Sequence, residues 1–350
     1  MSEPRITLAD LAHSAGVSKM TVSRALRDER GIAEETRRHI LEIAQKLGYR
    51  PDPAVSALMG HLRQSRRTGL EPLAWLTTYS TIGGWKTNPG TVAIHRGATE
   101  QARKLGYRLE EFSLNTPGMT AKRLSSILYN QAIRGIVLAP LLEHGEIEGF
   151  AWEHFATACC GHSLLHPPLH RVSVDQFEVF RTAWQRLNAQ GYRRIGLCVS
   201  ATDNARIGFR WQGAQSVEAD TLPARDRIPP MITDDWTLES FERWFTSHKP
   251  DVVLSFAGTL DWLKTLGVRV PRDCGFALLR LDQAKAIAGV DHRFSDIGAA
   301  AVSLVVSELA TNQYGIPDVR KSVSIESLWR DGASLSARRR TQAARQPSRA

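Results

Sequence analysis

The sequence is poor in cysteine and has no long apolar run. Its four cysteines show no CxxC spacing and no neighbouring metal ligands, so neither a zinc site nor a disulfide framework is indicated. The adjacent pair Cys159-Cys160 lies in an apolar stretch, and we expect it to be reduced and buried. No stretch of about 18 apolar residues occurs, which argues against a transmembrane helix. The N-terminus carries no apolar signal region, so we expect a cytoplasmic protein.

The common catalytic motifs are also missing. The sequence has no P-loop or GxGxxG pattern, no HExxH among its 11 histidines and no GxSxG. His162, His166 and His170 are spaced around two prolines and not along one helical face, which favours polar loop positions over a metal site. An enzyme is therefore the disfavoured hypothesis, and we expect no catalytic residue, no metal and no cofactor.

Positive charge is confined to the two ends of the chain, whose net charge is +9. Residues 1–70 hold 12 lysines and arginines against eight acidic residues, residues 333–350 hold five arginines and no acid, and the part between is neutral. A positive N-terminal segment suits a polyanionic partner, whereas the neutral body gives no reason to expect nucleic acid there. The tail is predicted to be disordered, and it either attracts DNA non-specifically or only aids solubility.

Residues 17–27 are predicted to form a helix with a DNA-binding face. Ser18 suits the N-cap, and Val22 and Leu26 share one face at i, i+4. The opposite face carries Lys19, Met20, Ser23, Arg24 and Arg27. Cations and hydroxyls reach phosphates and base edges, and an apolar tip can meet a thymine methyl group.

Another predicted helix comes just before it. Thr7 offers an N-cap, Asp10 is a capping-box acid, and an inward stripe follows at Leu8, Leu11, Ala12 and Ala15. Gly16 stands where a tight turn between two helices requires a positive φ. Helix, glycine turn and helix describe a helix-turn-helix. The alternative is an ordinary amphipathic surface helix, which is a common element.

A third helix and longer motifs favour DNA binding. Residues 33–47 place Ile40, Ile43, Ala44 and Leu47 on one face, with Gly48 as the stop. This region closely resembles the lactose/purine-repressor family. The family pattern T-x-x-D-[VL]-A-x-x-A-G-V-S-x-x-T-V-S-R is matched from Thr7 to Arg24. Its T-R-x-x-[IV] is matched from Thr36 to Ile40, and its G-Y-x-P from Gly48 to Pro51.

The resemblance implies a homodimer in which each helix-turn-helix reads half of a roughly palindromic operator through the major groove. The expected base contacts are Lys19, Met20 and Arg24. The expected phosphate contacts are Thr7, Ser18, Thr21, Ser23 and Thr36. The predicted interface is completed by Leu8, Arg27 and Tyr49.

Residues 52–72 are predicted to form a hinge helix and a basic linker. Asp52 can cap a short apolar helix that begins at Pro53. The resemblance implies that Leu58 wedges between base pairs in the minor groove. Asp52 and Pro53 both depart from the family pattern, and the alternative is a plain interdomain linker.

From Leu73 onward, short apolar runs alternate with helical patterns. The strands are predicted at 73–78, 109–114, 135–140, 155–161, 194–200, 251–256 and 275–279, and the helices at 92–105, 121–131, 176–190 and 260–266. This order predicts an α/β fold with parallel sheets covered on both faces. The family resemblance continues more loosely at Val172–Gln176, Ile297–Leu304 and Arg330–Ser334. It implies a two-lobed, periplasmic-binding-protein-like module that closes on a small molecule.

Three stretches are candidate ligand sites because they follow predicted strands, at whose carboxyl ends such folds bind ligands. They are residues 77–85, 203–213 and 281–283, and their ligand candidates are Thr78, Tyr79, Trp85, Arg210 and Asp282. A solvated loop or a structural ion pair is the alternative for each. The family's N-D-x-x-A-x-G is absent after residues 251–256, so sugar or purine contacts cannot be carried over.

The sequence therefore predicts four parts. They are a DNA-binding domain (1–51), a hinge and linker (52–72), a ligand-binding and dimerisation module (73–332) and a basic tail (333–350). We expect a dimeric transcriptional regulator with double-stranded operator DNA, a small-molecule effector such as a sugar or related metabolite, and no membrane as partners. The alternative is a DNA-binding dimer whose large domain is only a dimerisation platform.

Overall fold

The structure is a computed structural model that describes residues 6, 8–26, 32–47, 49, 70–281 and 286–336. The chain divides into an N-terminal unit that ends at Leu70 and a larger unit that begins at Glu71. The predicted hinge (Asp52, Pro53, Leu58) and most of the predicted tail lie outside the described residues.

The N-terminal unit contains three helices, α1 (Leu8–Ala15), α2 (Lys19–Ala25) and α3 (Glu34–Lys46). Leu11, Val22 and Ile40 are fully buried where the three helices meet. This confirms the predicted inward faces, except at Leu47, which is 38% exposed. Leu47 follows the last residue of α3 as its C-cap, so it does not continue the buried stripe of that helix.

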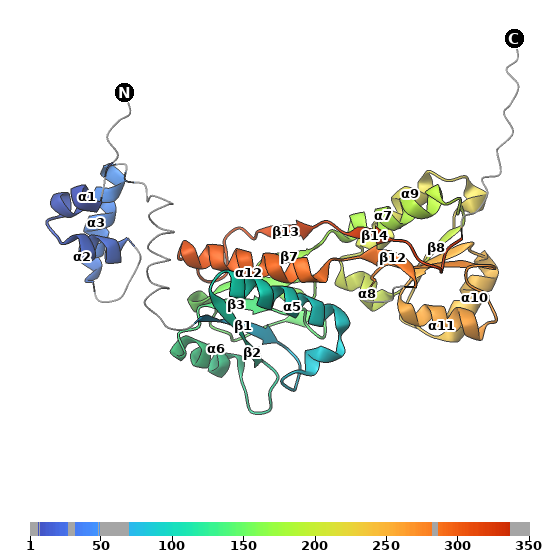
Figure 1. The fold of residues 1–350 in the computed structure, drawn as a ribbon, viewed down its shortest axis with the longest axis horizontal. Helices are drawn as coiled ribbons and strands as arrows, with labels where there is room; N and C mark the ends of the chain where they lie inside the picture. Colours follow the sequence, from blue (N-terminus) through green and yellow to red (C-terminus); the bar gives the residue numbers. More distant parts are fainter. Residues whose placement is uncertain are drawn as a thin grey trace, which may run out of the picture. The chain divides into compact units, whose positions relative to one another are not determined.

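The larger unit contains two six-stranded sheets, one in each lobe (Figure 1). The first lobe's sheet is parallel throughout, in the order β13-β7-β5-β3-β1-β2. Its strands are β1 (Glu71–Thr77), β2 (Tyr107–Ser113), β3 (Gly135–Leu138), β5 (Ala156–Cys160), β7 (His170–Val174) and β13 (Ser322–Ile325). A separate two-stranded sheet is formed by β4 (Gly145–Glu146) and β6 (Leu164–His166), which come between β3 and β7 in the sequence.

Helices cover both faces of the first sheet, as the alternation of strand side chains requires. Leu76 faces the cluster that includes Leu128 of α6 (Ala121–Asn130). Trp75 faces the other way, and its ring lies 5.2 Å from that of His95 in α5 (Pro89–Lys104). Helix α12 (Phe294–Ala310) packs directly on α5, backbone to backbone, at two glycines.

The second lobe has the strand order β14-β12-β11-β10-β8-β9, in which only β14 is antiparallel to its neighbour. Its strands are β8 (Ile195–Ser200), β9 (Met231–Thr233), β10 (Val252–Ser255), β11 (Gly275–Leu278), β12 (Ala288–Asp291) and β14 (Leu328–Arg330). Its helices are α7 (Gln176–Ala189), α8 (Ala201–Arg206), α9 (Arg210–Asp220), α10 (Leu238–His248) and α11 (Ala257–Thr265). The parallel α/β prediction is confirmed in both lobes.

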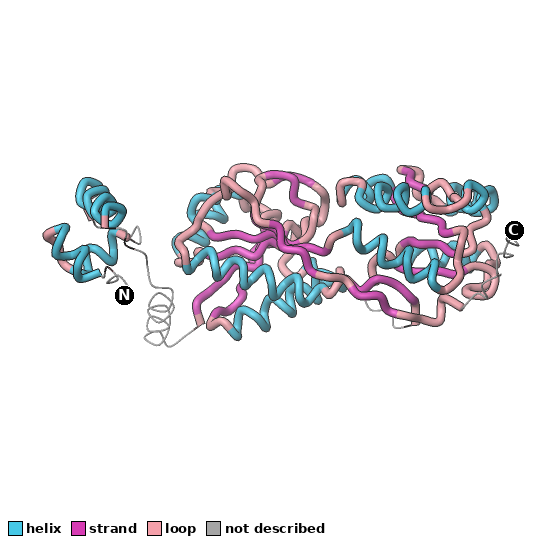
Figure 2. The backbone as a smooth tube through the Cα atoms, turned by 90° about the horizontal axis from the view of Figure 1, so that it is seen from above, coloured by secondary structure: helices cyan, strands magenta, loops and turns pink. Residues whose placement is uncertain are grey.

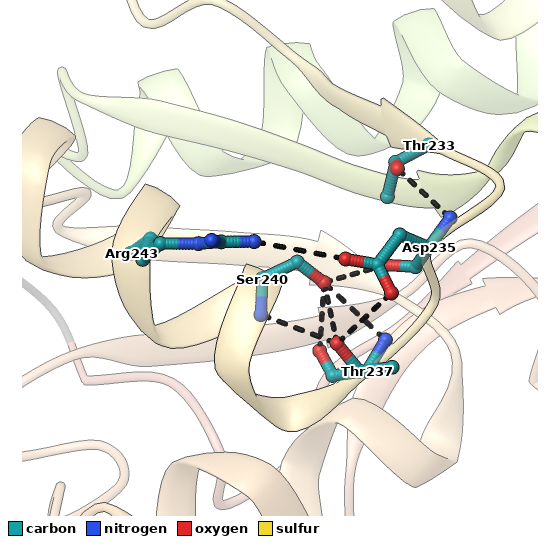
Figure 3. A network of polar contacts seen from close by, with 5 residues as sticks. All are labelled: Thr233, Asp235, Thr237, Ser240 and Arg243. Atoms are coloured by element: carbon teal, nitrogen blue, oxygen red, sulfur yellow. Dashed lines mark hydrogen bonds and ion pairs between the residues drawn. The ribbon is translucent and has the colours of Figure 1, made fainter.

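Helix α10 was not predicted from the sequence, although its start carries a capping box. Thr237 and Ser240 satisfy each other's backbone N–H groups, and Asp235 extends this network to Arg243 at 3.6 Å (Figure 3). Phe241 and Trp244 then point into the core of the second lobe. The cap and the two buried rings together fix where this helix begins.

Three connections pass between the lobes (Figure 2). They run from β7 to α7, from β12 to α12 and from β13 to β14. The four cysteines are buried in the lobes as free thiols, which confirms the prediction for Cys159 and Cys160. None of the described helices is long and apolar enough to cross a bilayer.

Candidate functional sites

The predicted recognition helix is α2 (Lys19–Ala25), which begins at the predicted Ser18 cap and reaches its C-cap at Leu26, earlier than the predicted end at residue 27. Ser18 is the N-cap, with its Oγ accepting from the backbone N–H of Thr21 at 3.0 Å and lying 2.8 Å from Thr21 Oγ1. Gly16 has a φ of +65°, so the turn between α1 and α2 uses the left-handed conformation that glycine allows. The buried side of α2 is held by Val22, and its other side faces solvent.

The solvent face of α2 borders a concavity of about 300 Å³. Its lining residues are Ser18, Met20, Thr21, Arg24, Ile32, Ala33 and Thr36. Met20 is 72% exposed, an unusual position for a large apolar side chain, and Lys19 beside it is also exposed. Hydroxyls, a guanidinium and an apolar tip thus share one surface, which is the chemistry needed for phosphates and thymine methyl groups.

The remaining predicted DNA contacts are either partly buried or outside the described residues. Leu8 and Tyr49 are partly buried against the core of the three helices. The backbone of Ser23 lies within α2, but its side chain is outside the described residues. Thr7, Arg27 and Leu58 are also outside them. For all these residues, DNA contact stays a prediction.

The first candidate ligand stretch begins where β1 ends, and it is held by internal hydrogen bonds. Thr78 Oγ1 accepts from the backbone N–H of Leu142 at 3.1 Å, and Thr78 O accepts from Asn115 Nδ2 at 2.6 Å. Tyr79 is half-buried, and its main-chain oxygen accepts from Ser113 Oγ. These contacts fix the loops that follow β1, β2 and β3 against one another.

Trp85 is part of the core and is not an exposed platform. It is 3% exposed, its Nε1 donates to Glu111 Oε1 at 2.7 Å, and its ring lies 4.4 Å from that of His95. The prediction that Trp85 offers a ring to a ligand is therefore corrected. Its partner Glu111 lies on β2, 26 residues away, so no local sequence signal could have identified the pair.

The second candidate stretch is largely helical, and no helix was predicted there from the sequence. It contains α8, a turn with positive φ at Gly208 and Phe209, and the first residues of α9. Arg210 is exposed at the start of α9, and its Nη1 donates to Ile207 O. Asp282, in the third stretch, lies outside the described residues.

A hydrogen bond joins the two lobes at this edge. Arg206, the last residue of α8, donates from Nη2 to the main-chain oxygen of Leu142 at 2.9 Å. Leu142 follows β3 in the first lobe, and α8 follows β8 in the second. The carboxyl ends of the two sheets therefore face each other, which is where a ligand enters folds of this kind.

His162, which follows β5, also lies at this edge. Its Nε2 is 3.4 Å from Val174 O and its Nδ1 is 3.4 Å from Arg171 Nη1, which fits a neutral ring protonated on Nε2. Burial lowers the pKa of His162 to about 4, and the positive charges of Arg171 and Arg210 act in the same direction. His162 was expected to be a polar loop residue, and no role was predicted for Arg171 or Arg206. No described group of histidine, cysteine or acidic side chains could hold a metal ion.

Comparison with known proteins agrees with the helix-turn-helix and with the two-lobed body. Residues 7–52 match the model of the family described as "Bacterial regulatory proteins, lacI family". The HTH-type transcriptional regulator KdgR of Bacillus subtilis (strain 168) is 25% identical over 288 residues, which cover 77% of this chain and 80% of that protein. The sucrose operon repressor of Escherichia coli is 27% identical over 305 residues, with 82% and 86% covered.

Solved structures share the fold of this chain at low sequence identity. The transcriptional regulator CelR in complex with cellobiose has a TM-score of 0.55 at 19% identity, with 94% of this chain and all of that chain covered. The lac repressor dimer bound to operator and the anti-inducer ONPF has a TM-score of 0.55 at 16% identity, with 95% and 100% covered.

The capped helix with its exposed polar face, together with the matched family model, defines a helix-turn-helix transcriptional regulator. Residues 7–52 thus match a DNA-binding domain of the LacI type, and over most of its length the chain is similar to transcriptional regulators such as KdgR and the sucrose operon repressor.

Proposed function

We propose that this regulator is a homodimeric repressor whose affinity for operator DNA is set by a small molecule bound between its lobes. The observation that carries the DNA-binding part is the solvent face of α2, where Met20 is exposed beside Lys19 and the hydroxyls of Ser18 and Thr21. We assign base contacts to Lys19, Met20 and Arg24. The hydroxyl groups around the concavity would contact phosphates and set the orientation on the duplex.

The proposed division of labour follows the predicted domains. Residues 1–51 bind DNA, 52–72 connect the parts, and 73–332 bind the effector and the second subunit. Because the partner is DNA, the protein is proposed to act in the cytoplasm. The names of similar proteins, among them a sucrose operon repressor and a regulator bound to cellobiose, support a sugar or related metabolite as the effector.

The effector is proposed to bind where the carboxyl ends of the sheets face each other. Thr78, Tyr79 and Arg210 come from stretches at this edge, and Asp282 is retained there from the sequence prediction. A ligand that bonds to both lobes favours one relative arrangement of them, and the linker would transmit that arrangement to the DNA-binding domains. Coupling of this kind is typically worth about 1–3 kcal/mol.

The test is to select operator DNA from a random pool with the full-length protein and then to screen metabolites for release or enhancement. We expect an enriched, roughly palindromic sequence and at least one metabolite that changes its affinity. If no sequence is enriched above background, the proposed DNA-binding function is wrong. If an operator is enriched but no metabolite changes its affinity or the thermal midpoint of the protein, the large domain is only a dimerisation platform.

A further inference from the structure

Three arginines gather at the edge where the lobes face each other. Arg206 and Arg210 belong to the second lobe, at the end of α8 and the start of α9. Arg171 belongs to β7 in the first lobe, and it reaches Leu164 O with Nη2 at 2.8 Å and His162 with Nη1. Arg206 bonds directly across to Leu142.

Two histidines lie among these charges, since Arg171 Nη1 is 3.4 Å from the His162 ring and Arg206 bonds to Leu142, two residues before His144. Arg171 and Arg210 both act on His162, and Arg206 and Arg171 both act on His144. Burial is the largest cause of the lowered pKa of each histidine, and these arginines add to it. Each histidine is therefore close to charges from both lobes. Like charges that are brought together raise the free energy of the site unless an anion compensates them.

No described carboxylate pairs with any of the three guanidinium groups. Within the described structure, their hydrogen-bond partners are main-chain oxygens, the His162 ring and, for Arg171, the Cys159 thiol. The Nε of Arg206 is buried without a partner. Other arginines of the same lobes behave differently, since Arg181 and Arg269 each bind carboxylates at 2.7–3.0 Å. Asp175, an acid that acts on His162, already caps α7 by accepting from two backbone N–H groups.

Neutral polar groups without partners accompany these charges. Asn204 and Trp211 flank Arg206 and Arg210 in the chain and are 1% and 4% exposed. Asn204 Oδ1 and Trp211 Nε1 have no partner within the described structure. The Trp211 ring lies 5.5 Å from that of Phe256, which follows β10. Buried groups of this kind are costly unless a ligand or water satisfies them, so the region is also equipped to bind hydroxyl groups.

We propose that the effector is an anion, a small metabolite whose carboxylate or phosphate is bound by Arg171, Arg206 and Arg210. This inference rests on the proposed function, because it takes the edge between the lobes as the effector site. Guanidinium groups bind both kinds of oxyanion through paired N–H donors. An anion placed there cancels charges that otherwise repel across the two lobes, so its binding favours their approach and provides the signal.

The experiment compares sugars that differ only in charge. The thermal midpoint of the full-length protein is measured with D-glucose, D-gluconate and D-glucose 6-phosphate, and with D-ribose, D-ribonate and D-ribose 5-phosphate, at matched ionic strength. We expect an acid or a phosphate ester to raise the midpoint and its neutral parent to leave it unchanged. Which of the two anions acts distinguishes a carboxylate from a phosphate ligand.

Variants assign the effect to the cluster. Arg206→Gln and Arg210→Gln should each weaken binding of the active anion about tenfold or more, because each removes a charge-assisted contact. Arg269→Gln removes a guanidinium that pairs with Asp273 before β11, at the opposite end of that strand, and should leave binding unchanged. Without ligand, Arg206→Gln should not lower the midpoint, since it relieves repulsion.

The inference is overturned if no anion in either series raises the midpoint, or if a neutral sugar binds as well as its acid. It is also overturned if both cluster variants bind the anion as the wild type does. A selected operator that only neutral sugars release leaves the proposed function standing and removes this inference. Conversely, failure to select any operator removes the proposed function, while anion binding is still measured by the midpoint.

Discussion

Gly298 allows α12 to contact α5, and Gly298→Ala should destabilise the larger unit. A Cβ placed at Gly298 would lie 1.9 Å from Ile94 O of α5, and one placed at Gly97 would lie 1.8 Å from Ser295 O of α12. Both contacts involve backbone atoms, which cannot rotate away. A carbon normally approaches a carbonyl oxygen to no less than about 3.3 Å. The two helices would therefore have to separate by more than about 1 Å.

The expected loss follows from two opposed effects. Overpacking of a close contact costs about 1–3 kcal/mol and occasionally more, whereas alanine favours a helix over glycine by about 1 kcal/mol. Because the obstacle is backbone, we expect the upper end of that cost and a net loss of about 2 kcal/mol in the free energy of unfolding. In a unit of this size, the thermal midpoint would fall by about 4–8 °C.

Tryptophan fluorescence is the suitable assay, because all nine tryptophans lie after residue 70 and report only on the larger unit. Gly213→Ala is the matched control. Gly213 is exposed within α9, and a Cβ there meets nothing within 4 Å. This control should gain about 0.5–1 kcal/mol. A Gly298→Ala midpoint at or above that of the wild type would refute the close-contact argument.

A double variant tests whether the two glycines serve the same contact. Once Gly298→Ala has separated the helices, Gly97→Ala should add little further loss. Neighbouring substitutions that relieve one shared constraint are non-additive, whereas independent ones add. A double variant that loses the sum of the two single losses would show that each glycine has a separate role.

Three further predictions concern DNA binding and acid stability. Arg24→Ala should cost about 1–3 kcal/mol in operator binding and relax specificity at one base position, whereas an equal loss on random DNA would make Arg24 a phosphate contact. Ser18→Ala removes the cap of α2 and should cost about 1 kcal/mol in stability as well as operator affinity, while Thr120→Ala, which removes the equivalent cap of α6, should leave operator affinity unchanged. Burial lowers the pKa of His292 from 6.5 to about 4, so the unfolded chain takes up this proton first and stability falls as the pH drops from about 6.5 towards 4, by at most about 3 kcal/mol. His292→Gln should make the fall in urea-unfolding stability over this pH window less steep, while His162 retains its own contribution, and an unchanged slope would contradict the assignment.

The sequence predicts the N-terminal unit well because its signals are local. The cap at Ser18 and the positive φ at Gly16 depend on residues within a few positions of each other, and both are confirmed. The predicted burial of Leu47 was wrong, because helical periodicity does not show where the neighbouring helices stop covering the apolar face. In the larger unit, predicted strands match observed ones to within a few residues, since a buried parallel strand is a short continuous apolar run.

Elements with weak local signals were missed or misread. No helix was predicted in the stretch that contains α8 and the start of α9, which has glycine and several polar residues, although Ser200 caps α8 by accepting from the Asp203 N–H. Helix α10 had a readable signal in Thr237 and Ser240 that the sequence analysis did not use. For Trp85, by contrast, the deciding partner is Glu111, and only the pairing of β1 with β2 brings the two together.

The arginines of the candidate effector site also could not be predicted from the sequence, because only the fold brings them together. Arg171 and Arg206 are 35 positions apart and belong to different lobes, and neither stands in a recognisable motif. These two arginines are significant because no described carboxylate pairs with them. Whether an arginine has an acidic neighbour in space cannot be read from the sequence. Arg210 could be identified as a candidate because its stretch follows a predicted strand, yet that position alone left a structural ion pair as an alternative. Main-chain oxygens are the hydrogen-bond acceptors of Arg206 and Arg210, and they carry no charge that would neutralise the guanidinium groups. This positive charge, which no described carboxylate neutralises, makes a negatively charged ligand the expected partner.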